Sequence, residues 1–226
     1  GWTYGEDAND PVPASETNGI EHVTYQYKVK EAEDNTYSAA VPIAAGSYTV
    51  KATFSATENY NEVTATADFT ITKATYNMTD VKFEDASYTY DGNEKALTIS
   101  GTLPTGVTVA YENNKRTNAG SVTATAKFTI ADSNNYCAID DKTATLTITK
   151  AKPTVSISAK PDSLRGGGKV TLTVTGVPGE GNVIVTCDNG ITVDNKNGTY
   201  SAVLPNRTVD YTFTLNYTGA ENGNYS

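Results

Sequence analysis

Few residues of this chain have the side chains that enzymes use for nucleophilic or zinc chemistry. His22 is the only histidine, in the stretch GIEHVTYQY, and the two cysteines are Cys137 and Cys187. A Ser-His-Asp or Cys-His arrangement would have to be built around His22, and a zinc site needs more His and Cys ligands than these. We expect His22 to be a solvated residue at a strand end. The sequence therefore predicts no catalytic residue, and a chain that is not an enzyme.

Acidic residues are numerous, with 26 Asp and Glu, so counting alone leaves room for a carboxylate pair of the glycosidase type. Most of them lie in loops such as GEDAND and EAEDN, where charge usually keeps a surface solvated. Three loops, TENYN, ADSNNY and VDNKNG, gather the oxygen ligands that calcium prefers. None fits the EF-hand pattern, because Lys196 stands where that loop needs a ligand. We predict Asx turns there, and no metal ligand or cofactor.

Aromatic residues raise the question of sugar binding. Four of them near the N-terminal end could stack on pyranose rings: Trp2, Tyr4, Tyr25 and Tyr27. Tyr25 and Tyr27 share a strand face with Val23 and Val29, so we expect these two tyrosines in the core. The position of Trp2 stays open, because a strand beside it is expected to be missing. No ligand-binding residue is assigned.

Two covalent links between side chains are also conceivable. Cys137 and Cys187 fall in different predicted modules, so we expect two half-buried free thiols rather than a disulfide. Some surface modules close a Lys-to-Asn amide bond beside a carboxylate, but no pair here stands out. A mass lower by one ammonia would reveal such a bond.

Composition indicates a folded chain that avoids polyanions. Of its 226 residues 38% are hydrophobic and 19% charged, which is typical of globular proteins. The net charge of -9 disfavours nucleic acid and anionic lipid as partners. No stretch reaches the roughly 20 apolar residues of a membrane helix, and no leader precedes GWTYGED. We expect a fragment of a longer protein that does not insert into membranes.

One strand pattern occurs three times, in AGSYTVKATFSATENY, AGSVTATAKFTIADSNNY and DYTFTLNYTGAENGNY. In each, apolar and polar residues alternate with the period of a strand that has one buried face. An Asn-Tyr pair follows each strand: Asn59-Tyr60, Asn135-Tyr136 and Asn224-Tyr225. We conclude that the loop belongs to the repeat as much as the strand does.

A closing strand follows the first two copies, in VTATADFTITKA and KTATLTITKA. The inward positions predicted for the first are Ala65, Ala67, Phe69 and Ile71, and for the second Ala144, Leu146 and Ile148. Ile71 and Ile148 are 77 residues apart, the length of a small β module. The predicted modules are module one (1–73), module two (74–150) and module three (151–226).

Many short, evenly spaced strands without a helical stretch predict an all-β fold, a tandem array of three small immunoglobulin-like β-sandwich modules. We expect a first strand to be missing from module one and a last strand from module three, which leaves exposed edges. The linkers TKAT and TKAKPT are short, and Pro153 keeps Lys152 extended. Modules of about 35 to 40 Å would give an extended rod of about 110 Å.

Module two contains two distinctive turns and a distinctive strand end, Tyr90-Asp91-Gly92, Asn118-Ala119-Gly120 and Ile148-Thr149-Lys150-Ala151. With these motifs it closely resembles the MBG-type repeat of bacterial surface proteins. Module one is similar from Tyr25 onward, with GWTYGE in place of the Tyr-Asp-Gly turn. Module three looks like a generic bacterial immunoglobulin-like repeat, similar to the others only over Tyr211 to Tyr225. The resemblance implies a secreted or wall-attached protein and carries no catalytic residues.

These observations predict a non-catalytic structural or spacer region of a bacterial cell-surface or secreted protein, with neighbouring repeats as its partners. The alternative is an adhesive module that binds host glycan or protein through loops at the module ends.

Overall fold

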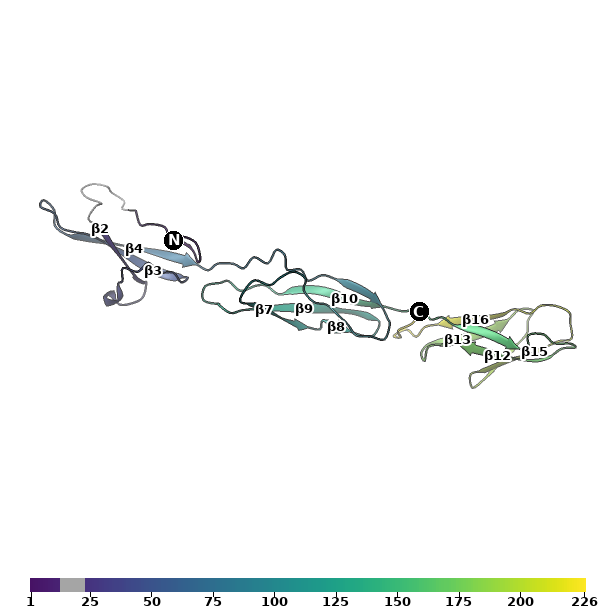
Figure 1. Ribbon diagram of the computed structural model, residues 1–226. Helices are drawn as coiled ribbons and strands as arrows, with labels where there is room; N and C mark the ends of the chain where they lie inside the picture. Colours follow the sequence, from purple (N-terminus) through teal and green to yellow (C-terminus); the bar gives the residue numbers. More distant parts are fainter. Residues whose placement is uncertain (13–22) are drawn as a thin grey trace. The chain divides into compact units, whose positions relative to one another are not determined.

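The computed structural model describes residues 1–12 and 23–226, so the strand-end position expected for His22 lies outside the described residues. The described chain is built of β-strands with one short 3-10 helix, η2 (Asp34–Thr36) (Figure 1). Two compact units are present. One consists of Gly1–Lys82, Ser100–Ala110 and Lys127–Asp141, and the other of Phe83–Ile99, Tyr111–Ala126 and Lys142–Ser226. Among the described strands, each sheet takes its strands from one predicted module, and the module boundaries themselves stay predictions.

The first sheet has the order β1-β4-β3-β2. Its strands are β1 (Trp2–Thr3), β2 (Val23–Val29), β3 (Gly46–Phe54) and β4 (Val63–Thr72). β3 runs antiparallel to both β2 and β4, whereas β1 runs parallel to β4 with Trp2 opposite Ile71. The last residues of β4 are thus held between two strands.

The predicted inward face of β4 is wrong for Ala65 and Ala67, which are exposed, and correct for Ile71, which is buried. The aromatic rings that cover this face gather around Phe69, near the C-terminal end of the strand. Trp2 stacks on Phe69 at 5.2 Å, Tyr48 stacks on it at 5.6 Å, and Tyr27 meets it edge-on at 6.1 Å. Among the described residues no ring contact covers the other end of β4, so alternation alone did not predict burial there.

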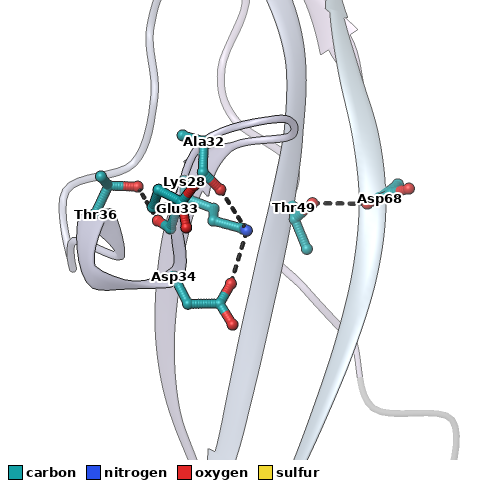
Figure 2. A network of polar contacts seen from close by, with 7 residues as sticks. All are labelled: Lys28, Ala32, Glu33, Asp34, Thr36, Thr49 and Asp68. Carbon is teal, nitrogen blue, oxygen red and sulfur yellow. Dashed lines mark hydrogen bonds and ion pairs between the residues drawn. The ribbon is translucent and has the colours of Figure 1, made fainter.

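The opposite face of the first sheet, predicted to be solvated, is partly covered. The segment after β2 folds back and Lys28 Nζ donates to the Ala32 carbonyl and to Asp34, each at 2.7 Å (Figure 2). Beside it Thr49 is buried and its hydroxyl donates to Asp68 at 2.7 Å. Thr49 is therefore buried on this face, whereas its partner Asp68 stays exposed, and strand periodicity does not encode that difference.

The second sheet has the order β5-β10-β9-β7. Its strands are β5 (Ala86–Thr89), β7 (Val107–Glu112), β9 (Gly120–Ile130) and β10 (Lys142–Thr149), with a small pair β6 (Lys95–Ala96) and β8 (Lys115–Arg116) elsewhere in the same module. β5 runs parallel to β10, as β1 does to β4. The predicted inward residues Ala144, Leu146 and Ile148 are all buried, which confirms this face.

The strands of module three form a sandwich of two sheets (Figure 1). One has the order β11-β12-β15-β14 and the other pairs β13 with β16. The strands are β11 (Ser156–Lys160), β12 (Gly168–Thr175), β13 (Asn182–Cys187), β14 (Val193–Lys196), β15 (Thr199–Leu204) and β16 (Phe213–Thr218). In chain order these are strands A to F of the immunoglobulin-like arrangement, with A, B, E and D in one sheet and C and F in the other.

Residues from both of these sheets build one core. Val170, Leu172 and Ala202 face Val185 across the sandwich, and Phe213 and Leu215 pack against the cluster. The predicted alternation of Phe213 and Leu215 with exposed Thr214 is confirmed. The chain is all-β and built of immunoglobulin-like β-sandwich modules in tandem. None of the helices in its described part has the length and apolar character needed to cross a membrane.

Candidate functional site: two equivalent joints

The Asn-Tyr pairs and the Lys-Ala pairs, which the sequence repeats separately, meet in the structure. We call joint one the contact of Lys73-Ala74 with the loop Asp132–Tyr136, and joint two the contact of Lys150-Ala151 with the loop Ala220–Tyr225. Each joint lies within one compact unit, joint one in the first and joint two in the second. In both, the chain that has just left a closing strand lies beside the loop that follows the next module's repeated strand.

Backbone hydrogen bonds form a short parallel ladder in joint one. The Ala74 N–H donates to the Asn135 carbonyl at 2.9 Å, and the Cys137 N–H donates back to the Ala74 carbonyl at 2.8 Å. These two bonds bridge Ala74 to Tyr136. The linker residue is thus paired as if it extended the strand before it.

The same ladder recurs in joint two. The Ala151 N–H donates to the Asn224 carbonyl at 2.8 Å, the Ser226 N–H donates to the Ala151 carbonyl at 2.9 Å, and Ala151 bridges to Tyr225. A Cβ at Gly219 would lie 1.9 Å from the Tyr225 carbonyl oxygen, so this position requires glycine for the loop to close. Two loops of unlike sequence therefore present the same backbone groups.

The lysine of each Lys-Ala pair holds the approaching loop. Lys73 Nζ donates to the Ser133 carbonyl at 2.6 Å, and Lys150 Nζ donates to the carbonyls of Ala220 and Glu221 at 2.6 and 2.9 Å. Ammonium donors make stronger hydrogen bonds to carbonyls than neutral donors do. Each lysine adds a charged contact to the ladder without needing a carboxylate partner.

The asparagine of each Asn-Tyr pair reaches a turn that is remote in the chain. The Ala45 N–H donates to Asn135 Oδ1 at 2.9 Å, and the Ala119 N–H donates to Asn224 Oδ1 at 2.8 Å. Ala45 and Ala119 occupy the same place in the repeat, directly before strands β3 and β9. One asparagine side chain thus ties the loop of one predicted module to a turn of the module before it.

The tyrosine of each pair meets an equivalent ring. Tyr136 contacts Tyr4 edge-on with centroids 5.5 Å apart, and Tyr225 contacts Tyr90 in the same way at 5.5 Å. Tyr4 and Tyr90 follow the parallel strands β1 and β5, and their N–H groups donate to Thr72 and Thr149, each at 2.9 Å. Tyr4 of GWTYGE thus has the same place in module one as Tyr90 of the Tyr-Asp-Gly turn in module two.

Different carboxylates support the two loops. In joint one, Asp132 accepts from the Asn135 N–H at 3.1 Å and from its side-chain amide at 2.9 Å. The bond from the Asn135 side chain is the main reason that the pKa of Asp132 is lowered. In joint two, Glu180 accepts from the N–H groups of Asn224 and Tyr225. The carboxylate that accepts from the backbone of the loop is part of the loop in joint one, and belongs to the distant residue Glu180 in joint two.

The aromatic residues considered for sugar binding serve other contacts. Trp2 stacks on Phe69, and Tyr4 belongs to joint one. Tyr25 and Tyr27, which we expected in the core, are half-buried. Val29, expected beside them in the core, is 57% exposed. Val29 is the last residue of β2, and its expected place in the core is wrong.

The loops considered for calcium include two Asx turns. Asp132 is engaged by Asn135, and Asn195 Oδ1 accepts from the Gly198 N–H at 3.0 Å. Within residues 1–12 and 23–226, no group of three His, Cys, Asp or Glu side chains is placed to hold a metal ion. Both cysteines are free thiols. Cys187 is half-buried as predicted, whereas Cys137 is exposed, so the prediction is wrong for that residue.

The two joints were missed at the sequence level, although their parts were visible. The repeat of Asn-Tyr and of Lys-Ala was recognised, but no partner was assigned to either. The signal that could have found them is that both pairs recur together, each time with an Ala-Gly turn and a tyrosine after the first strand of the repeat.

Module three also has an open groove of about 1000 Å³ at the ends of its strands. Arg165 and Arg207 line it together with Asp210 and Tyr211. Cations, a carboxylate and an aromatic ring in one groove are groups that could contact a polar ligand.

No protein-family model and no curated protein sequence matches the chain. Among solved structures it is similar to PcdhgB3 EC1-4, with a TM-score of 0.32, 10% identity, and coverage of 88% of this chain and 63% of that one. It is similar to the extracellular cadherin domains 1-4 of Protocadherin Gamma B7 with a TM-score of 0.31, 10% identity, and coverage of 87% and 66%. The chain spans less than two thirds of either cadherin chain.

The chicken CNTN1 FN1-FN3 domains match with a TM-score of 0.22, 15% identity, and coverage of 87% of this chain and 85% of that one. These scores and identities are low, so the fold is assigned from the chain's own strands and sheets.

Proposed function

We propose that this chain is a non-catalytic spacer region of a bacterial cell-surface or secreted protein, in which a repeated joint connects each module to the next. The observation that carries the proposal is the recurrence of the joint: the same ladder, lysine, asparagine and tyrosine contacts occur at Ala74 and at Ala151. A linker that only connected two domains would not need the same remote contacts twice.

The composition of the joint suits a mechanical role. Each contains two backbone bonds, an asparagine bond to a remote turn, at least one lysine bond and at least one aromatic contact, all between groups that are present whether or not a ligand binds. A neutral hydrogen bond contributes about 0.5 to 1.5 kcal/mol and an aromatic pair a similar amount. Together these contacts would limit the swing of neighbouring modules, which is what a spacer that presents other domains requires.

Two further observations support the proposal. The Tyr-Asp-Gly and Ala-Gly turns that resemble the MBG-type repeat are those that carry Tyr90 and Ala119, which are contact residues of joint two. The net charge of -9 suits an exposed surface that avoids nucleic acid and anionic lipid. In this proposal, neighbouring repeats are the binding partners of the chain.

Distance measurements between spin labels test the proposal. Labels at Thr66 and Thr123, with both native cysteines replaced by serine, should give one narrow distance distribution. We expect Asn135→Ala with Tyr136→Ala to broaden it. Asn134→Ala, an exposed neighbour in the same loop, is the matched control and should leave it narrow. A distribution that is broad before any substitution would contradict the spacer role.

The groove at Arg165 and Arg207 favours a second candidate, an adhesive module for host glycan or protein. A glycan and matrix-protein array would test it on the intact chain. Binding that is lost in Arg165→Ala with Arg207→Ala, and kept in Lys196→Ala outside the groove, would support adhesion. An array without signal would leave the spacer role as the function.

A further inference from the structure

The third Asn-Tyr pair, Asn59-Tyr60, occupies the same place in the repeat as the two docked pairs. It follows strand β3 and precedes β4, as Asn135-Tyr136 lies between β9 and β10. Asn135, Tyr136, Asn224 and Tyr225 are all half-buried in their joints. Asn59 and Tyr60 are exposed instead, with 56% of Tyr60 accessible to solvent.

The backbone groups that form the ladder are also open at this loop. In the two joints they are the carbonyl of the asparagine and the N–H that follows the tyrosine. The corresponding groups here are the Asn59 carbonyl and the Asn61 N–H, and among the described residues neither has a hydrogen-bond partner. The loop is closed by a bond of its own, from the Thr57 N–H to the Tyr60 carbonyl at 2.9 Å. Its shape is therefore set, and its docking groups have no partner within the part of the chain that the structure describes.

We propose that the Asn59-Tyr60 loop is a docking surface for the end of a preceding module of the same kind. The occupant is defined by the two joints already described. It is a strand end with Lys-Ala, an Ala-Gly turn whose alanine N–H meets Asn59 Oδ1, and a tyrosine after a parallel edge strand that meets Tyr60. This inference rests on the proposed function, because it treats the joint as a device that the chain repeats.

The chemistry of this occupant follows residue by residue. The lysine would donate to the Thr57 carbonyl, which lies two residues before Asn59 as Ser133 lies two before Asn135. The alanine after that lysine would pair with the Asn59 carbonyl and the Asn61 N–H. The loop after Phe54 is shorter than the loop after Phe128, so the lysine has fewer carbonyls to choose from. We therefore expect a single lysine bond, as in joint one.

The test extends the whole chain at its N-terminus with a second copy of residues 74–151, followed by a second copy of residues 75–86 that leads into Gly1. This places Gly1 directly after a copy of Ala86, in the position that Ser87 has in module two, because Trp2 pairs with Ile71 as Tyr88 pairs with Ile148. Hydrogen exchange measured by mass spectrometry then reports on the segment 55–62. We expect its exchange to slow at least tenfold relative to the unextended chain, toward the rate of segment 131–138.

Matched variants separate docking from simple extension. In the extended chain, Asn59→Ala with Tyr60→Ala should return segment 55–62 to fast exchange, whereas Glu62→Ala, exposed beyond the loop, should not. Slow exchange in the copied counterparts of β9 and β10 establishes that the added module is folded. Unchanged exchange at 55–62 beside a folded added module would overturn the proposal.

Two other outcomes are decisive. If the unextended chain dimerises in sedimentation experiments, and Asn59→Ala abolishes the dimer, the loop binds a second copy and the proposed occupant is wrong. If segments 131–138 and 219–226 exchange quickly in the unextended chain, the joints themselves fail and the proposed function fails with them. Slow exchange there combined with fast exchange at 55–62 in the extended chain would refute only this inference.

Discussion

Joint one and joint two share their ladder, lysine, asparagine and tyrosine contacts, but differ in what supports the docked loop. In joint one the loop supplies its own carboxylate, Asp132. In joint two the carboxylate is Glu180, from the segment between β12 and β13. The docking contacts are thus common to both joints, and each module stabilises its loop by its own means.

The rings around the docked tyrosine differ as well. Tyr136 has Tyr4 at its edge and is stacked on Tyr76 at 4.2 Å, whereas Tyr225 has the edge contact with Tyr90. Tyr76 comes two residues after Ala74, and the same position after Ala151 is Pro153. Joint one therefore gains an aromatic stack where joint two has a residue that restricts the backbone. The linker sequence therefore changes the aromatic contacts of a joint, while the ladder, lysine and asparagine contacts stay the same.

The largest effect is expected from cavities in the cores behind the joints. Module two supplies the loop of joint one and the turn of joint two, so Leu146→Ala should open both. Leu172→Ala in module three should open joint two alone. Both leucines are buried, and each change should cost about 2 to 5 kcal/mol. Hydrogen exchange of segments 131–138 and 219–226 checks this, and loss of joint one in Leu172→Ala would contradict the comparison.

Removal of the docking asparagine should have the next largest effect, confined to one joint. Asn135→Ala leaves the Ala45 N–H without its acceptor and Asp132 without its amide donor, so we expect joint one to weaken by about 1 to 3 kcal/mol. Asn224→Ala should weaken joint two by less, because its side-chain amide makes a longer bond of 3.4 Å to Asn118. Local amide exchange at Ala74 and Ala151 measures the two effects separately. Equal loss in both would show that the amide donors do not matter.

Substitution of the docked tyrosines should produce a smaller difference in stability between the two joints. Tyr136→Leu removes two aromatic contacts and Tyr225→Leu removes one, and each pair contributes about 0.5 to 1.5 kcal/mol. Joint one should therefore lose more. Tyr76→Leu in joint one should reduce this difference, as read from exchange at Ala74. Exposed Tyr60→Leu is the control and should change neither joint.

Acidification should produce the smallest difference in stability between the two joints. The pKa of Asp132 is lowered, mainly by its bond with the Asn135 side chain. Its contribution is therefore present above the unfolded pKa of about 3.9 and is lost as the pH falls through the lower folded value. The Asn135 N–H shift in an NMR titration should follow that loss. In Asp132→Asn this acid transition should disappear, and a transition that persists would assign it to another group.

Much of the fold could be predicted from the sequence. Strict alternation in Val122 to Phe128 and in Ala144 to Ile148 correctly identified the buried face of the second sheet, because a strand's side chains must alternate between its two faces. The same rule failed at Ala65 and Thr49 of the first sheet. What packs on a face is decided by rings and loops from elsewhere in the chain, and periodicity carries no information about them.

The repeats themselves were determined by the sequence, since the spacing of the Asn-Tyr, Lys-Ala and Ala-Gly pairs is visible without coordinates. Their meeting was decided by tertiary structure alone. Asn135 and Ala45 bond across ninety residues of chain, and Glu180 reaches Asn224 from another strand connection. A local pattern states which groups are available for hydrogen bonding. Only the folded sheets, through the positions at which their strands end, bring those groups within bonding distance.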